Sequence, residues 1–344
     1  MKFGLWDHVD ASGQPFTELL DDRLAFVAAA DELGYYCYHV AEHHATPLNL
    51  VPVPGVYLGA VAQATRDIKL GPLVYLLPLY SPLRLIEEIC ILDQLSHGRL
   101  QVGVGRGVSP YELGYHKIDP AESREIMIEA LETVLYGLTH ERLDHHGKHF
   151  DYTDVPMELE AFQKPHPPIW YASSNPESSK WAGEKGYHMA TLGSTAHAKA
   201  CVGAFREAYR ANGTPAVENH DFPGGVAMGA VRHIVIADTD ADALKIAGDA
   251  YDYWYLSLTK LERNNVAGPK ITKNMATTAD AAIAAGSVVV GSPDTVAEKL
   301  RGQIEEVGLN YLIAGFAFGS IGQENAMRSL RLFASDVRPR LEAL

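Results

Sequence analysis

Short apolar stretches alternate with segments of helical periodicity along the whole chain, and this alternation restricts the possible folds more than any other feature of the sequence. Strands that alternate with helices pair in parallel, because each helix carries the chain back across the sheet. The stretches predicted as strands are Phe3–Trp6, Tyr35–Val40, Ile68–Leu77, Leu100–Val104, Pro168–Ala172, His188–Leu192, Val231–Ala237 and Tyr311–Ala314. Eight such strands close a (β/α)8 TIM barrel, so we predict an α/β fold of this type.

The boundaries of the predicted helices are marked by specific residue types. Ser81–Pro82 and Ser292–Pro293 each place a capping residue before a proline suited to the first helical turn. Gly98 and Gly308 stand where these two helices should end, since glycine readily adopts the left-handed conformation found there. The spacing therefore supports regular strand and helix units.

An open, doubly wound sheet in two domains is the alternative architecture. No Pro/Gly/Ser-rich linker or change in composition divides the chain, so we expect one domain over residues 1–344 with two insertions. Residues 142–155, with Gly147 near the middle, are predicted as a hairpin excursion. Residues 257–286 break the alternation and are predicted as a mobile lid, because long connections in compact domains are usually functional.

Composition excludes several classes of partner. The net charge is −14 and no basic stretch offsets it, which argues against nucleic-acid binding. The three cysteines, Cys37, Cys90 and Cys201, lie far apart, so neither a disulfide framework nor a thiolate zinc site is expected. The most apolar window, Leu70–Leu79, contains two prolines and is about half the ~20 residues that a membrane span requires. We expect a cytoplasmic protein with no membrane partner.

Polar and aromatic residues follow several predicted strands. The active site of a (β/α)8 barrel lies at the carboxyl ends of its strands, so these residues are expected to meet at one rim. They are Trp6–His8, Glu42–His44, Tyr75, Gly105–Gly107, Ser173–Asn175, Gly193–Ser194 and Phe316.

The run Glu42-His43-His44 permits more than one interpretation. Histidine and carboxylate ligate metals, but neighbours on an extended segment point in opposite directions, so no metal site is expected. One histidine acting as a general acid or base fits the pKa of imidazole, while a buried packing histidine is the alternative.

Two further motifs are compatible with anion binding. Gly103-Val104-Gly105-Arg106-Gly107 lacks the GxGxxG spacing of a dinucleotide fold, yet it exposes an arginine between glycines where a phosphate can approach. Ser174, Asn175 and Ser178 precede or begin a predicted helix, where they either cap the helix or bind a phosphate at its N-terminus.

These motifs together resemble the bacterial luciferase-like family of flavin-dependent monooxygenases. The resemblance extends from Phe3 to about Phe333. It is strongest from Pro82 to Gly107, with Glu42-His43-His44 upstream and Trp181-Ala182 downstream.

The resemblance implies roles for individual residues. His43 matches the catalytic histidine and Glu42 its neighbour in the pocket, while Leu73-Val74 matches a dipeptide joined by a cis bond that lies against the flavin. Arg106 and Gly107 match the flavin-binding turn, and Ser174, Asn175 and Ser178 match the phosphate-binding turn. Two positions depart from the luciferases, because Gly105 replaces a reactive cysteine and Ser174 an acidic residue, so light emission is not implied.

The function implied by the resemblance is oxygenation of a small organic substrate with O2 and reduced FMN, which a separate flavin reductase supplies. We expect Trp6, Tyr75 and Phe316 to form an apolar wall of the substrate pocket, and we expect a homodimer. Hydride transfer by reduced deazaflavin is the alternative activity. A non-catalytic flavin-binding homologue is the alternative from another functional class.

Overall fold

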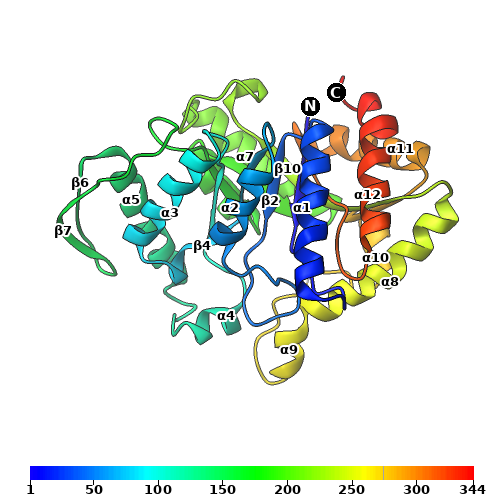
Figure 1. Ribbon diagram of the computed structural model, residues 1–344, viewed down its shortest axis with the longest axis horizontal. Coiled ribbons are helices and arrows are strands. Elements are labelled where there is room, and N and C mark those ends of the chain that lie inside the picture. The colour runs from blue at the N-terminus through cyan, green and yellow to red at the C-terminus, as the bar shows by residue number, and fades with distance from the viewer. Residues whose placement is uncertain (274) are drawn as a thin grey trace.

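The central feature of the fold is a parallel barrel surrounded by helices (Figure 1). The computed structural model describes residues 1–273 and 275–344, with residue 212 described by its backbone alone. One sheet of ten strands has the order β3-β2-β1-β12-β10-β9-β8-β5-β4, with β11 paired to β10. Its members are β1 (Lys2–Asp7), β2 (Cys37–Val40), β3 (Lys69–Pro72), β4 (Tyr75–Leu76), β5 (Val102–Gly105), β8 (Ile169–Ser173), β9 (His188–Leu192), β10 (Met228–Ile236), β11 (Val288–Gly291) and β12 (Tyr311–Gly315).

The third strand of the barrel is interrupted, unlike the continuous strand Ile68–Leu77 that the sequence predicted. β3 and β4 flank the peptide bond between Leu73 and Val74, which is cis, as the resemblance implied. β4 pairs with β5, and an isolated parallel bridge joins Leu70 to Leu100, so the ring closes between the third and fourth strand positions. Counting β3 and β4 as one strand and setting β11 aside leaves eight of the ten strands, which confirms the (β/α)8 barrel.

Strand β11 was not predicted, and it occupies an unusual position. His233 of β10 pairs with Gly315 of β12 and also with Val288 of β11, so β11 lies on the edge of β10 opposite β12. β9 pairs with the same edge of β10 over its first residues, Met228–Val231. β11 therefore continues the sheet where β9 has ended.

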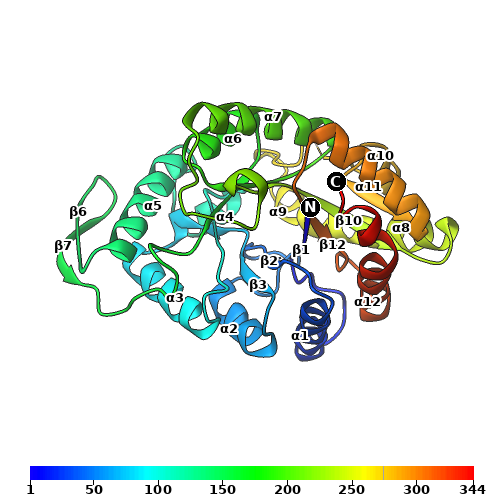
Figure 2. The same cartoon turned by 90° about the horizontal axis from the view of Figure 1, so that it is seen from above.

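Helices form the outer layer, as the view from above shows (Figure 2). Their bounds are α1 (Phe16–Glu32), α2 (Pro54–Ala64), α3 (Pro82–Leu95), α4 (Pro110–Tyr115), α5 (Ser123–Thr139), α6 (Pro176–Glu184), α7 (Thr195–Asn212), α8 (Asp240–Leu258), α9 (Lys260–Asn264), α10 (Ala279–Ala284), α11 (Pro293–Val307) and α12 (Gln323–Leu332). Gly98 and Gly308 have φ values of +79° and +74°, which explains why glycine follows α3 and α11. Among the described residues, no helix is both long and apolar enough to cross a bilayer.

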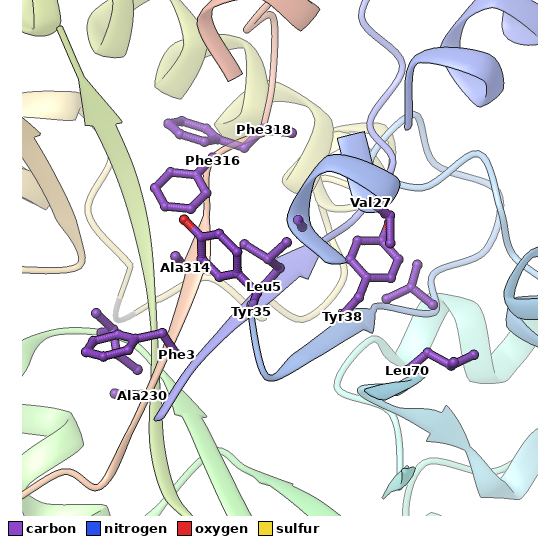
Figure 3. Packing of buried hydrophobic residues seen from close by; sticks show 14 of the residues in the cluster. Phe3, Leu5, Val27, Tyr35, Tyr38, Leu70, Ala230, Ala314, Phe316 and Phe318 are labelled. Carbon is purple, nitrogen blue, oxygen red and sulfur yellow. The ribbon is translucent and has the colours of Figure 1, made fainter. Parts of the chain in front are cut away.

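Two separate apolar clusters stabilise the barrel. The larger fills the space between strands and helices and contains Tyr35, Phe316 and Phe333, whose rings pack edge to face or tilted; Figure 3 shows Tyr35 beside Phe316. The smaller lies inside the barrel and includes Trp170 and Tyr311. The barrel interior is therefore a packed core and not a pore.

Both predicted insertions have defined secondary structure. β6 (Arg142–His146) and β7 (Asp151–Pro156) pair antiparallel in a hairpin that projects beside α5, and the Glu129 carboxylate accepts hydrogen bonds from the backbone of its turn. Residues 257–286 contain the end of α8, then α9 and α10, while residue 274 lies outside the described residues. The mobility of that stretch remains a prediction.

Candidate active site

His43 lies beyond the carboxyl end of β2 and pairs with a carboxylate that the sequence analysis did not identify. Its Nδ1 lies 3.1 Å from Glu112 Oε1, and the two side chains are 19% and 5% exposed. A carboxylate only accepts hydrogen bonds, so Nδ1 donates and Nε2 is left for proton transfer. This is the geometry of a general acid or base held by a carboxylate partner.

Glu42, the neighbour of His43, has a different environment. Its Oε2 accepts hydrogen bonds from the Leu76 backbone N–H at 3.0 Å and the Tyr80 hydroxyl at 2.9 Å, and its Oε1 accepts from His44 Nε2 at 2.8 Å. Burial lowers the pKa of His44, but the hydrogen bond and charge of Glu42 outweigh this and raise it. Glu42 thus joins the ends of the second and third barrel strands.

An aromatic wall covers the carboxyl ends of β1, β10 and β12. Trp6 packs on His8 and His233, with ring centroids 4.1 and 5.9 Å apart. His233 also contacts Phe318 at 4.2 Å and Trp254 of α8 at 4.8 Å. Desolvation lowers the pKa of His233 to about 3 and, with the nearby His43 and His233, lowers the pKa of His8 well below its usual value. The wall is therefore uncharged at neutral pH.

The structure does not bring Tyr75 or Phe316 to this wall, so their predicted place in the pocket is wrong. The Tyr75 hydroxyl donates to Glu88 of α3, and Phe316 packs against Tyr35 and Phe333 behind the sheet. Side chains alternate across a strand, so Leu76 faces the barrel interior and Tyr75 faces α3. Phe318, in the loop after β12, contacts His233 in place of Phe316.

Basic groups gather at the ends of β5 and β8, across the barrel mouth. Burial raises the pKa of Tyr171, and the nearby Arg106 and Arg124 guanidinium groups and the Ser178 hydroxyl oppose that rise. Arg106 is exposed, and Ala172 is also exposed although it lies within the central strand β8. This side of the barrel mouth is therefore open and positively charged.

The turn before α6 is held by its own polar side chains. Asn175 Oδ1 accepts from the Ser178 backbone N–H at 2.9 Å, which caps the helix, and the Ser173 hydroxyl lies 2.9 Å from Ser178 Oγ. Ser174 is exposed beside this cap. The capping interpretation of the sequence therefore holds for Asn175, while phosphate binding by Ser174, Asn175 and Ser178 stays a prediction.

The glycines before Arg106 are explained by close packing against the third barrel strand. A Cβ at Gly103 would lie 2.1 Å from the Pro72 carbonyl oxygen, and one at Gly105 would lie 2.6 Å from Val74 Cγ2. Gly107 has a φ of +82°, which glycine adopts readily. The motif therefore brings the Leu73-Val74 segment against β5, and it does not indicate a dinucleotide fold.

Several residues of the site could not be identified from the sequence. Glu112, Arg124 and Trp254 lie on helices α4, α5 and α8 and reach the barrel mouth only through the tertiary fold. His8 directly follows β1, and His233 lies within β10, opposite the last residue of β12. His8 was included among residues following strands but was given no role. His233 was placed inside a predicted strand, where its alternation with Val231 indicates an inward direction.

Comparison with known proteins identifies the family. The model of the family described as "Luciferase-like monooxygenase" matches residues 1–311. The chain belongs to this family and is an enzyme, a flavin-dependent oxidoreductase of the luciferase-like class.

Individual relatives resemble the chain over different lengths. "Uncharacterized protein y4wF" of Sinorhizobium fredii is 38% identical over 341 residues, covering 99% of this chain and 97% of its own. The "Flavin-dependent trigonelline monooxygenase, oxygenase component" of Acinetobacter baylyi is 26% identical over 198 residues, covering 55% and 53%. The fold resembles that of the oxygenating constituent of 3,6-diketocamphane monooxygenase from Pseudomonas putida, solved with FMN, with a TM-score of 0.82, 23% identity and coverage of 99% and 98%.

Proposed function

We propose that this enzyme oxygenates a small organic substrate with O2 and reduced FMN. The observation that carries the proposal is that one barrel face combines an open, basic side with a dry, uncharged side that holds a paired histidine. When bound, reduced FMN supplies two electrons, so that one oxygen atom of O2 enters the substrate and the other leaves as water.

The phosphate of FMN fits the basic side of the site. Arg106 supplies a permanently charged, exposed guanidinium, and Arg124 lies near the same Tyr171. Ser174 and Ser178 add hydroxyl groups beside the N-terminus of α6, where the Ser178 N–H already serves the Asn175 cap. Gly107 follows Arg106, and the Leu73-Val74 segment, which packs against Gly103 and Gly105 of β5, is the proposed contact of the flavin ring.

His43 moves protons in this proposal. Glu112 fixes the imidazole through Nδ1, which leaves Nε2 to give or take a proton at the reacting centre. Glu42 acts indirectly, because its carboxylate is engaged by Leu76, Tyr80 and His44.

The aromatic wall excludes water from the reacting centre. Trp6 and Phe318 present apolar rings, and Trp254 covers His8 and His233 from α8. Excluding water protects reactive species from unproductive decay. A substrate that reaches this wall meets neutral side chains, which favours an uncharged organic molecule.

A separate reductase and a homodimer complete the proposal. A relative named as an oxygenase component supports an external source of reduced flavin. On the neighbouring helices α2 and α3, Val56, Ile91 and Leu95 are 77%, 51% and 42% exposed, an apolar surface suited to a second copy of the chain. Sedimentation equilibrium tests this surface, because Ile91→Glu should shift a dimer toward monomer, and a wild-type monomer would refute it.

Cofactor titration tests the proposed function directly. We expect reduced FMN to bind tightly in the absence of oxygen. After mixing with O2, the flavin absorbance should return to that of oxidised FMN more slowly in the complex than for free reduced FMN. Binding of reduced deazaflavin alone would favour hydride transfer without O2. No measurable affinity for either flavin would favour a non-catalytic homologue.

A further inference from the structure

Helix α4 carries two consecutive side chains that contact different parts of the molecule. Glu112 pairs with His43, while the Tyr111 hydroxyl lies 2.8 Å from the Pro269 carbonyl oxygen and 3.5 Å from that of Asn265. Consecutive helical residues point about 100° apart, so one short helix reaches both partners. Figures 1 and 2 both show α4 beside α9, which precedes residues 265–269.

The contact between Tyr111 and this segment depends on Gly268. A Cβ at Gly268 would lie 2.3 Å from the Tyr111 hydroxyl oxygen and 3.1 Å from its ring. The Gly268 backbone N–H donates to the Asn265 carbonyl at 2.8 Å, which closes the turn that receives Tyr111. The absence of a side chain at this position therefore permits the close approach.

The other hydrogen bonds described for this segment are local. The Glu262 carboxylate accepts from the backbone N–H groups of Ile271 and Thr272 at 2.6 and 2.8 Å, and Asn265 donates to Leu261. Residues 263–267 are exposed. The Tyr111 bond thus links a locally held, solvent-exposed segment to the helix that holds the partner of His43.

We propose that Tyr111 is a positioning residue that couples the segment 265–269 to the His43–Glu112 pair. Displacement of the segment shifts α4 through Tyr111 and so moves Glu112 relative to His43. Ordering of the segment stabilises the hydrogen bond between Glu112 and His43. The coupling is reciprocal, since a link between two sites acts equally in both directions. Its catalytic consequence rests on the proposed role of His43, but the coupling itself belongs to the free protein.

Two substitutions break the link by different means. Tyr111→Phe removes the hydroxyl and keeps the ring, whereas Gly268→Ala pushes the segment away from it. Tyr115→Phe is the matched control, because Tyr115 lies on the same helix and is 56% exposed. Amide hydrogen exchange across residues 262–273 reports how often the segment opens. The solvent-exchange rate of the His43 Nδ1–H, in protein labelled with 15N-histidine, reports how well the hydrogen bond to Glu112 protects that proton.

We expect both exchange rates to rise about three- to tenfold in Tyr111→Phe, the change that loss of one hydrogen bond produces. Gly268→Ala should show at least the same effect, and Tyr115→Phe should change neither rate. In a double-mutant cycle, Glu112→Ala should accelerate exchange of the segment in the wild-type background but not in Tyr111→Phe.

Faster amide exchange of residues 262–273 with an unchanged exchange rate of the His43 Nδ1–H in Tyr111→Phe would overturn the proposal. Additive effects of the two substitutions in the double-mutant cycle would also overturn it. An unprotected His43 Nδ1–H in the wild-type chain would also overturn it, because the pair would then not be formed. FMN titration of the same variants measures flavin affinity independently of the two exchange rates. Loss of coupling with intact flavin binding refutes this inference alone, whereas coupling without flavin affinity refutes the proposed function alone.

Discussion

Gly103→Ala is the substitution that most directly tests how the glycine motif works. The added Cβ would lie 2.1 Å from the Pro72 carbonyl oxygen and 3.1 Å from Leu73 Cα, and neither backbone atom can rotate away. Overpacking of this kind costs roughly 1–3 kcal/mol, and an obstacle made of backbone favours the upper half of that range.

The expected cost converts to a measurable shift in melting temperature. With an unfolding entropy of about 2.1 cal/mol/K per residue, a 344-residue chain loses about 3–4 °C for 2–3 kcal/mol. Displacement of Leu73 and Val74 should also weaken FMN binding, because that segment lies against β5 beside Arg106.

Gly203→Ala is the control for the added methyl group. Gly203 is an exposed residue of α7, and a Cβ there would meet no atom within 4 Å in the described part of the chain. This change should stabilise the protein by about 0.5–1 kcal/mol. Thermal unfolding and FMN titration of both variants test the argument. A Gly103→Ala protein as stable as Gly203→Ala, with wild-type FMN affinity, would refute the packing explanation of the motif.

Three further outcomes are expected. His43→Ala should retain fold and flavin binding but lower turnover by about 10²–10⁴-fold, and unchanged turnover would make His43 a packing residue. Arg106→Ala should weaken FMN binding by about 1.5–3 kcal/mol and riboflavin binding far less. Equal losses of affinity for the two ligands would mean that Arg106 supports the loop conformation or contacts the flavin ring and not the phosphate. Trypsin should cleave the 257–286 stretch at the exposed Arg263, Lys270 or Lys273, with reduced FMN slowing the cleavage, and flavin-independent resistance would contradict a mobile lid.

The sequence was informative wherever local chemistry determines the structure. All eight predicted strand regions contain strands, and the proline and glycine boundaries of α3 and α11 lie where expected. First-turn prolines and left-handed glycines act within a few residues, so their effect can be read without tertiary context, although Ser81 and Ser292 stand at the N-caps without a side-chain capping bond.

Features that depend on tertiary contacts were missed or misassigned. β11 exists because the edge of β10 is free beyond the end of β9, which no local pattern reveals. The third strand is interrupted at Leu73-Val74, and beyond the interruption Leu76 and not Tyr75 faces the barrel interior. Glu112 reaches His43 across 69 residues of sequence, so only the fold could pair them.

The two halves of the barrel mouth meet opposite physical requirements. The proposed oxygenation needs a desolvated wall. Helix α8 contributes to this wall, because Trp254 packs on His233. The loop after β12 also lies close to α8, since a Cβ at Gly319 would lie only 2.0 Å from the Ala250 carbonyl oxygen. The proposed delivery of reduced FMN by a separate reductase would need an accessible site, and Arg106 and Ala172 at the ends of β5 and β8 are exposed. Because FMN would be held mainly through its charged phosphate at a solvent-exposed arginine, added salt should weaken its binding. The same salt should leave the wall intact, since its histidines are buried and neutral. If FMN binds as proposed, the exposed residues at the ends of β5 and β8 would hold it, while the buried, neutral wall near β1, β10 and β12 would exclude water from the reacting centre.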